Sequence, residues 1–286
     1  MAMIVGGFIM PHEPGVFLAP QERWSVETTR LRSHYDAIGA RIGELGATTV
    51  IVIGADHYVL FGPGCLPSYL IGIGEVSGPY ERFPGIEQGD IPNNPVLAHH
   101  IVRSGHALGF DWAVAKTLRV DHSIGIPARL CALPNPSVRA VVPVYLASGV
   151  EPLLPMARCY QLGRHIRDAV QTWDADERVV VIGSGGISHW VGLAQMGQVN
   201  ATFDKWVLDC FVSGDAAALI GRSDAEVLAQ GGNGAWEIRS FVCLMGAMPG
   251  CTGRLLAYES DPQWVTGMGF AELLAQPAPV DNEEYA

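Results

Sequence analysis

Three runs of nearly uninterrupted apolar residues constrain the fold of this chain most: Thr49–Ile53, Ala140–Tyr145 and Val179–Ile182. A strand with one wet face alternates apolar and polar side chains, whereas these runs are apolar at almost every position. Both faces of such strands must therefore be covered by other elements. Further strands are predicted at Met3–Phe8, Leu66–Ile73 and Trp112–Ala115.

Segments with helical periodicity alternate with these strands and are the elements that would cover the sheet. They lie at Trp24–Leu45, Pro95–Leu108, Ile126–Leu133, Met156–Trp173, Ala201–Ser213, Ala225–Gln230 and Ala235–Met248. We therefore predict an α/β fold with a central, largely buried sheet flanked by helices. No break in composition divides the chain, so residues 1–286 are predicted to form a single domain with a flexible tail at about 275–286.

Composition excludes several classes of protein. The net charge is −11 and no basic run occurs, which argues against nucleic acid or an anionic membrane surface as a partner. No apolar stretch is long enough to cross a membrane, and the N-terminus lacks the basic region of a signal peptide. The six cysteines include no C-x-x-C pair, which is typical of reduced thiols, so we expect a cytoplasmic protein.

Four histidines follow predicted strands: His12, His57, His122 and His189. In open α/β sheets, ligands bind beyond the carboxyl ends of the strands, so these imidazoles are expected to share one site. A lone histidine there is more often structural, but four in the same topological position indicate metal binding or acid–base chemistry. The other five are interpreted as surface or structural residues: His34, His99, His100, His106 and His165.

A carboxylate accompanies these histidines. Glu237 begins the stripe that continues with Phe241, Leu244, Met245 and Met248, so it is predicted on the apolar face of a helix. A carboxylate turned into a core needs a proton, a cation or a metal. Two histidines and one carboxylate form the ligand set of non-heme Fe(II) oxygenases. Spacing alone leaves open which two histidines bind a metal and which two act as acid–base groups.

At these residues the sequence resembles the class III extradiol ring-cleavage dioxygenases, the superfamily of the protocatechuate 4,5-dioxygenase catalytic subunit. The most similar branch is 2,3-dihydroxyphenylpropionate 1,2-dioxygenase. The matching stretches are PHEP, GADHYVLF, VDHSIGIP, GSGGISHW, WEIRSFVCLMGA and WVTGMGF, spread in family order over nearly the whole chain. Trp190 stands where the family commonly has Gln, and the segment between His189 and Glu237 is shorter than in the phenylpropionate branch. Both departures are expected to reshape the substrate pocket.

The resemblance implies Fe(II) bound by His12, His57 and Glu237, with His122 and His189 as unligated acid–base residues. It implies extradiol (meta) cleavage of an aromatic diol or aminophenol with O2, in the catabolism of aromatic compounds. It also implies a homo-oligomer, and it leaves open whether a separate small subunit is needed. The substrate itself, and cleavage proximal or distal to its substituent, stay undetermined.

Two other functions remain as alternatives: a different metal-dependent enzyme such as a zinc hydrolase, and a non-catalytic binding relative on the same fold. Retention of both extra histidines argues against a binding protein. The segment around Ser184 forms neither the G-x-S-x-G elbow nor the G-x-G-x-x-G dinucleotide pattern. A substrate carboxylate could meet Arg82, Arg129 or Arg239, and the sequence does not rank them.

Overall fold

A mixed sheet runs through the middle of the protein. The computed structural model describes residues 1–62, 64–149 and 151–275, so the predicted tail lies almost wholly outside the described residues. Nine strands form the sheet of the described chain, in the order β4-β3-β6-β2-β7-β1-β9-β8 with β5 paired to β3. The strands are β1 (Met3–Met10), β2 (Thr49–Ala55), β3 (Tyr69–Gly78), β4 (Gly89–Asp90), β5 (Ala113–Arg119), β6 (Ala140–Leu146), β7 (Arg178–Ser184), β8 (Gly253–Glu259) and β9 (Met268–Leu274).

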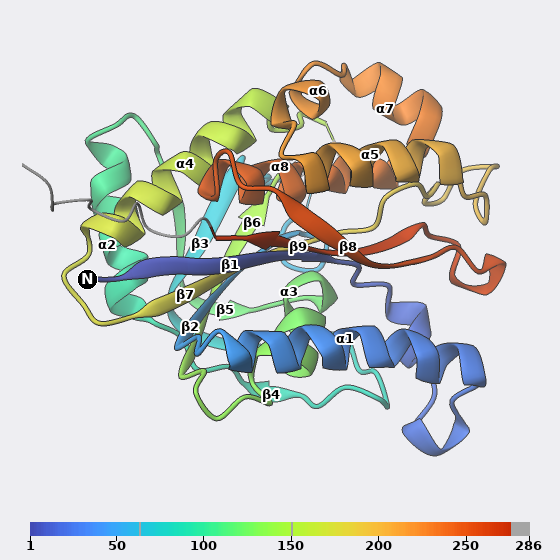
Figure 1. Ribbon diagram of the computed structural model, residues 1–286, viewed down its shortest axis with the longest axis horizontal. Coiled ribbons are helices and arrows are strands. Elements are labelled where there is room, and N and C mark those ends of the chain that lie inside the picture. Colours follow the sequence, from blue (N-terminus) through green and yellow to red (C-terminus); the bar gives the residue numbers. More distant parts are fainter. Residues whose placement is uncertain (63, 150, 276–286) are drawn as a thin grey trace, which may run out of the picture.

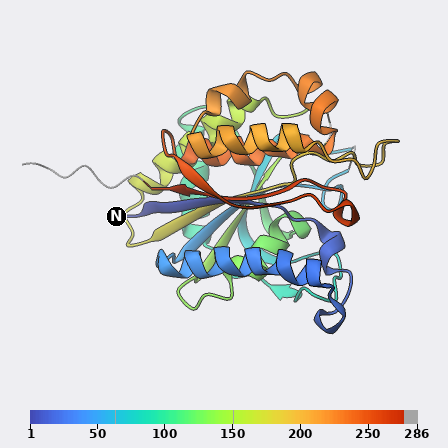
Figure 2. The same ribbon diagram turned by 45° about the vertical axis from the view of Figure 1, so that its right-hand side comes forward.

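Helices cover both faces of this sheet, as the uninterrupted apolar strands require (Figures 1 and 2). One face carries α1 (Val26–Glu44) and α3 (His122–Pro127), which continues as the π-helical turn Ala128–Ala132. The opposite face carries α2 (Pro95–His106), α4 (Met156–Thr172), α5 (Ala201–Ser213), α6 (Ala216–Ile220), α7 (Asp224–Gly231) and α8 (Ile238–Ala247). The predicted α/β class is confirmed.

Two hydrophobic cores result, one on each side of the sheet. Along β2, Val50 and Val52 point into the core beneath α1, while Ile51 and Ile53 point into the core beneath α4 and α8. All four side chains are fully buried. Such complete burial stabilises the fold by about 1.5–3 kcal/mol for each large aliphatic side chain.

Three parallel strands lie side by side at the centre, with β7 between β2 and β1. Their carboxyl ends therefore meet at one edge, which brings the residues after β1, β2 and β7 together. His12, His57 and His189 all follow these strands. Strand β5 runs in the opposite direction to these three strands. It is parallel to β3, and β3 is antiparallel to β6, which is itself parallel to β2.

The prediction that His122 lies at the same strand edge as the other three histidines is therefore wrong, although His122 does reach the same site. His122 opens helix α3, which packs against the end of β2. Ser123 fixes this junction, because its hydroxyl donates a 2.6 Å hydrogen bond to the carbonyl of Ala55. The helix rather than the strand order carries His122 into the site.

No helix among the described residues is long and apolar enough to span a membrane.

His165 lies away from the site, buried in α4, and is incompletely satisfied. Its ring stacks on Phe110 at 4.8 Å, and Nε2 donates to the carbonyl of Ile101 at 2.9 Å. Its Nδ1 is buried without a hydrogen-bond partner. Burial lowers the pKa of this imidazole below its usual value, so the folded protein holds it neutral.

This burial predicts a contribution to acid sensitivity. The unfolded chain takes up a proton at this position as the pH falls through about 6.5, while the folded chain resists it. The His165 contribution to stability is therefore intact above that pH and is lost below it. We expect His165→Leu to show a smaller loss of unfolding free energy between pH 7.5 and 5.5 than the unmodified protein, measured by urea denaturation. An equal loss in the two proteins would contradict this assignment.

Candidate metal centre and active site

Two imidazoles converge on one carboxylate beyond the central strands. Nε2 of His57 lies 3.0 Å from Oε1 of Glu237, and Nε2 of His12 lies 3.3 Å from the same oxygen. The ligand atoms of His12, His57 and His122 also all lie within 4.8 Å of one another. Nε2 of His189 is 4.0 Å from the other carboxylate oxygen, Oε2. The structure thus brings all five predicted site residues together.

Glu237 reaches the site from a 3-10 turn, Gly234–Glu237, that leads directly into α8. It is 4% exposed, as its place on the apolar stripe predicted. The predicted helix Ala235–Met248 is therefore divided, with Glu237 at the junction of its two parts. Oε2 accepts a 2.8 Å hydrogen bond from the backbone N–H of Gly186, which fixes the carboxylate against the turn after β7.

Each of the four histidines is held through Nδ1. The partners are the Ser184 hydroxyl for His12 (2.8 Å), Asp121 Oδ2 for His57 (2.8 Å), Glu81 Oε1 for His122 (2.6 Å) and the Ile187 carbonyl for His189 (3.3 Å). Because Nδ1 is engaged in every ring, Nε2 is the nitrogen left for chemistry. Partners of this kind orient metal-ligating histidines and raise their basicity.

Asp121 connects these elements. It caps the N-terminus of α3 by accepting from the Ser123 N–H, and it accepts from the Tyr145 hydroxyl and from both the N–H and the ring of His57. Burial opposes its ionisation, but the hydrogen bond and charge of His57 outweigh burial and lower the pKa of Asp121. Asp121 is not among the site residues predicted from the sequence, although an aspartate placed between a strand and a helix that begins with a candidate histidine is a signal for such a residue.

The central carboxylate is held in its charged form. Burial alone would raise the pKa of Glu237, but the charge of His12 and hydrogen bonds with His12 and His57 lower it well below its usual value. Burial likewise opposes protonation of His57, but hydrogen bonds with Asp121 and Glu237 raise its pKa well above the usual value. Burial dominates at His12 and lowers its pKa. An anionic carboxylate between two imidazoles is a donor set suited to a divalent cation.

The glycines before His189 act through close approach rather than through unusual backbone angles. Gly183, Gly185 and Gly186 are not among the residues with positive φ. A Cβ on Gly186 would lie 2.8 Å from Cε1 of His189, and one on Gly234 would lie 2.1 Å from its Nε2. The imidazole of His189 is therefore packed directly against backbone.

A cavity of about 280 Å³ opens onto these groups. It is lined by His12, Glu13, Pro14, His57, His122, Gly186, His189, Trp190, Val191, Met196, Glu237, Val265 and Thr266. An engineered apolar cavity of about 150 Å³ is enough for benzene, so this cavity accommodates a substituted aromatic ring.

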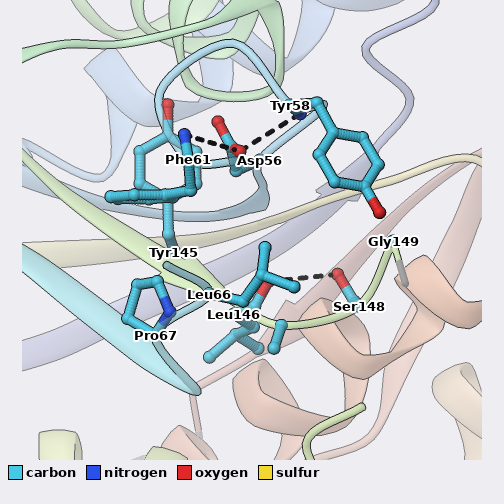
Figure 3. Close-up of a pocket in the computed structure, with 10 residues that line it drawn as sticks. Asp56, Tyr58, Phe61, Leu66, Pro67, Tyr145, Leu146, Ser148 and Gly149 are labelled. Carbon is cyan, nitrogen blue, oxygen red and sulfur yellow. Dashed lines mark hydrogen bonds between the residues drawn. The ribbon is translucent and has the colours of Figure 1, made fainter. Parts of the chain in front are cut away.

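A second cavity lies next to the turn that follows His57, and Figure 3 shows its lining. Asp56 shapes this turn by accepting from the N–H groups of Tyr58, Leu60 and Phe61. The second cavity measures only about 30 Å³, which is room for a water molecule or two and not for a ring. The larger cavity is therefore the candidate substrate site.

Backbone strain occurs next to His57 and in the wall of the larger cavity. Tyr58, directly after His57, has φ 59°, and Val265 in the cavity wall has φ 53°. They are the two non-glycine residues with positive φ in the described chain. The left-handed region is costly for a β-branched residue such as valine, and such strain clusters at functional sites.

Comparison with known proteins identifies the family. The profile described as "Catalytic LigB subunit of aromatic ring-opening dioxygenase" matches residues 6–269. The chain belongs to this family. The matched segment includes all five site residues, from His12 to Glu237, so the converging imidazoles belong to a LigB-type ring-opening dioxygenase domain.

The known proteins that this chain is similar to are distant in sequence. A protein of Photorhabdus laumondii named 2,3-dihydroxyphenylpropionate/2,3-dihydroxicinnamic acid 1,2-dioxygenase is 23% identical, over 86% of this chain and 90% of that protein. One of the same name from Cupriavidus necator is 26% identical, over 84% and 88%. The crystal structure of an uncharacterized protein from Escherichia coli K12 shares the fold, with a TM-score of 0.53, 13% identity and coverage of 94% and 99%.

Proposed function

We propose that this chain is an Fe(II)-dependent extradiol dioxygenase that cleaves a catechol-type ring with O2, beside rather than between the two hydroxyls. The observation that carries this proposal is the geometry around Glu237, whose Oε1 lies 3.0 and 3.3 Å from Nε2 of His57 and His12. Membership of the LigB family supports it independently.

In this proposal, His12, His57 and Glu237 hold the metal. The donor set fits, because it offers two imidazole nitrogens that converge on one anionic carboxylate. Bound Fe(II) would supply a Lewis acid that acidifies the hydroxyls of a chelated diol and an electron source for O2. Ser184 and Asp121 keep both rings turned with Nε2 toward Glu237.

The two remaining histidines move protons. Nδ1–H of His189 faces the carbonyl of Ile187, so its Nε2 carries a lone pair that can take a proton from a substrate hydroxyl. His122, with Nδ1 bonded to Glu81, offers a second Nε2 on the other side of His57, whose ring it stacks against at 4.2 Å. Both atoms of O2 enter the product, a ring-opened semialdehyde or keto acid, so no further reductant is needed.

The decisive experiment is anaerobic purification and metal analysis, followed by O2 uptake with catechols, protocatechuate, gallate and aminophenols. We expect stoichiometric iron, and O2 consumption matched by growth of the semialdehyde absorbance. Zinc or no metal, with no O2 uptake after reconstitution with Fe(II), would instead favour a hydrolase or a binding protein.

A further inference from the structure

Among the described residues, the wall of the candidate substrate cavity carries a carboxylate outside the proposed metal ligands, Glu13, and no lysine or arginine to balance it. Besides histidines, its charged residues are Glu13 and Glu237. No lysine or arginine lines it within the described chain, and neither residue type occurs at positions 63, 150 or 276–286. A carboxylate on the substituent of a substrate ring would therefore find no lysine or arginine partner in this wall.

The three arginines considered from the sequence are all occupied or remote. Arg239 is fully buried and donates to the carbonyl of Leu154 at 2.6 Å. Arg129 donates to the carbonyl of Gly78, the last residue of β3, at 3.1 Å. Arg82 is exposed and is not part of the cavity wall. None of them meets a ligand in the cavity.

Glu13 is fixed in the cavity wall, directly after His12. Its Oε2 accepts a 2.9 Å hydrogen bond from the hydroxyl of Thr266, and its Oε1 accepts one of 2.9 Å from the N–H of Gly15. Both oxygens are thus tied to the protein, and the carboxylate cannot swing away when a ligand enters. A fixed negative charge repels a second one, and the repulsion is stronger where the wall excludes water.

Most of the remaining wall is apolar. Its apolar side chains are those of Pro14, Trp190, Val191, Met196 and Val265, and the lining also includes Gly186 and Thr266. Val191 and Met196 are 55% and 61% exposed, so the rim presents hydrophobic surface that a ligand would cover. The volume of about 280 Å³ leaves room for a substituent beyond the ring.

We propose that this site selects catechol-type rings whose substituent is uncharged and largely apolar, and that Glu13 is the specificity-determining residue that excludes carboxylated rings. The inference rests on the proposed ring cleavage, and it assigns the site a substrate class different from the acids in the names of the relatives. Apolar contact with Val191 and Met196 favours the neutral substituent, and the Glu13 carboxylate disfavours an acidic one.

Isosteric pairs that differ only in charge test this directly. We would compare 2,3-dihydroxyphenylpropionate with its primary amide for kcat/KM, and 3-phenylpropionate with its amide for binding by calorimetry to the iron-loaded protein under anaerobic conditions. The neutral member should be preferred by about 10- to 100-fold in both pairs. An acid that binds as tightly as its amide would overturn the inference. Failure of ring cleavage alone would instead contradict the proposed function, because binding of the hydroxyl-free pair does not depend on turnover.

Substitution assigns the preference to one residue. Glu13→Gln keeps an acceptor oxygen for Thr266 or Gly15 and removes the charge, so the amide-to-acid ratio should fall toward unity. Glu22→Gln removes the same charge from an exposed position on the 3-10 turn Gln21–Arg23 and should leave the ratio unchanged. An unchanged ratio in Glu13→Gln would overturn the role of Glu13.

If Glu13→Gln does not fold, a measurement on the unmodified protein can still test whether charge repulsion excludes carboxylated rings. Added salt screens charge repulsion, so the ratio for binding of the hydroxyl-free pair should shrink between 0.01 and about 1 M ionic strength. A ratio that does not respond to salt would contradict exclusion by charge.

Discussion

Glu237→Ala should remove the metal and reduce ring cleavage to background. Its Oε1 is the atom on which His12 and His57 converge, at 3.3 and 3.0 Å, and it brings the only negative charge of the proposed ligand set. Loss of an outer partner of a metal ligand typically lowers metal affinity by about 10- to 100-fold, so loss of a ligand should exceed that. Iron per chain after desalting, measured together with O2 uptake, checks this expectation.

A suitable control is Glu87→Ala, which removes a carboxylate from an exposed position outside the site. It should retain iron and turnover. Circular dichroism should show that the Glu237→Ala protein is folded. A folded Glu237→Ala protein with stoichiometric iron would show that Glu237 is not a ligand.

His189→Ala should separate chemistry from binding. Nε2 of His189 is 4.0 Å from Glu237, farther than the nitrogens of His12 and His57, so its removal leaves the proposed ligand set complete. We expect normal iron content and normal anaerobic substrate binding. Turnover should fall by about 10²- to 10⁴-fold, the usual contribution of a positioned acid–base group.

His106→Ala offers a matched control, because His106 ends helix α2 at the surface. It should be indistinguishable from the unmodified protein in iron content and in kcat. If His189→Ala turned over at the normal rate, the acid–base role of His189 would be refuted. Loss of iron in that variant would instead place His189 among the ligands.

The central part of the fold could be predicted because its signals are local. Continuous apolar runs marked β2, β6 and β7, and their boundaries were correct to within two residues. Strands β8 and β9 were missed. They form an antiparallel hairpin at the sheet edge, where β8 is largely exposed and Arg254 pairs with the buried Glu272 of β9. Charged residues interrupt the apolar pattern of both strands. Arg254 and Glu272 lie on different strands, so their pairing cannot be read from either strand alone.

The four histidines and the glutamate of the candidate site could be predicted from the sequence, but the residues that orient the histidines could not. The histidines follow strands, and the three parallel strands at the centre of the mixed sheet bring three of them together. Three of the four partners that orient them are remote in sequence, and only the Ile187 carbonyl is close to its histidine, His189. Ser184 is 172 residues from His12, and Glu81 is 41 residues from His122. No periodicity or spacing reports such contacts, because only the folded chain brings the two atoms within reach.

The packing of His189 against Gly186 and Gly234 has a consequence for how the substrate specificity of this protein can evolve. The imidazole is set by neighbouring backbone, whereas Val191 and Met196 sit on an exposed rim with room around them. Substitutions at the rim should therefore shift the preferred substituent without disturbing the position of His189, the proposed acid–base group. Directed evolution toward new aromatic pollutants should accordingly leave residues 186 and 234 alone and randomise 191 and 196.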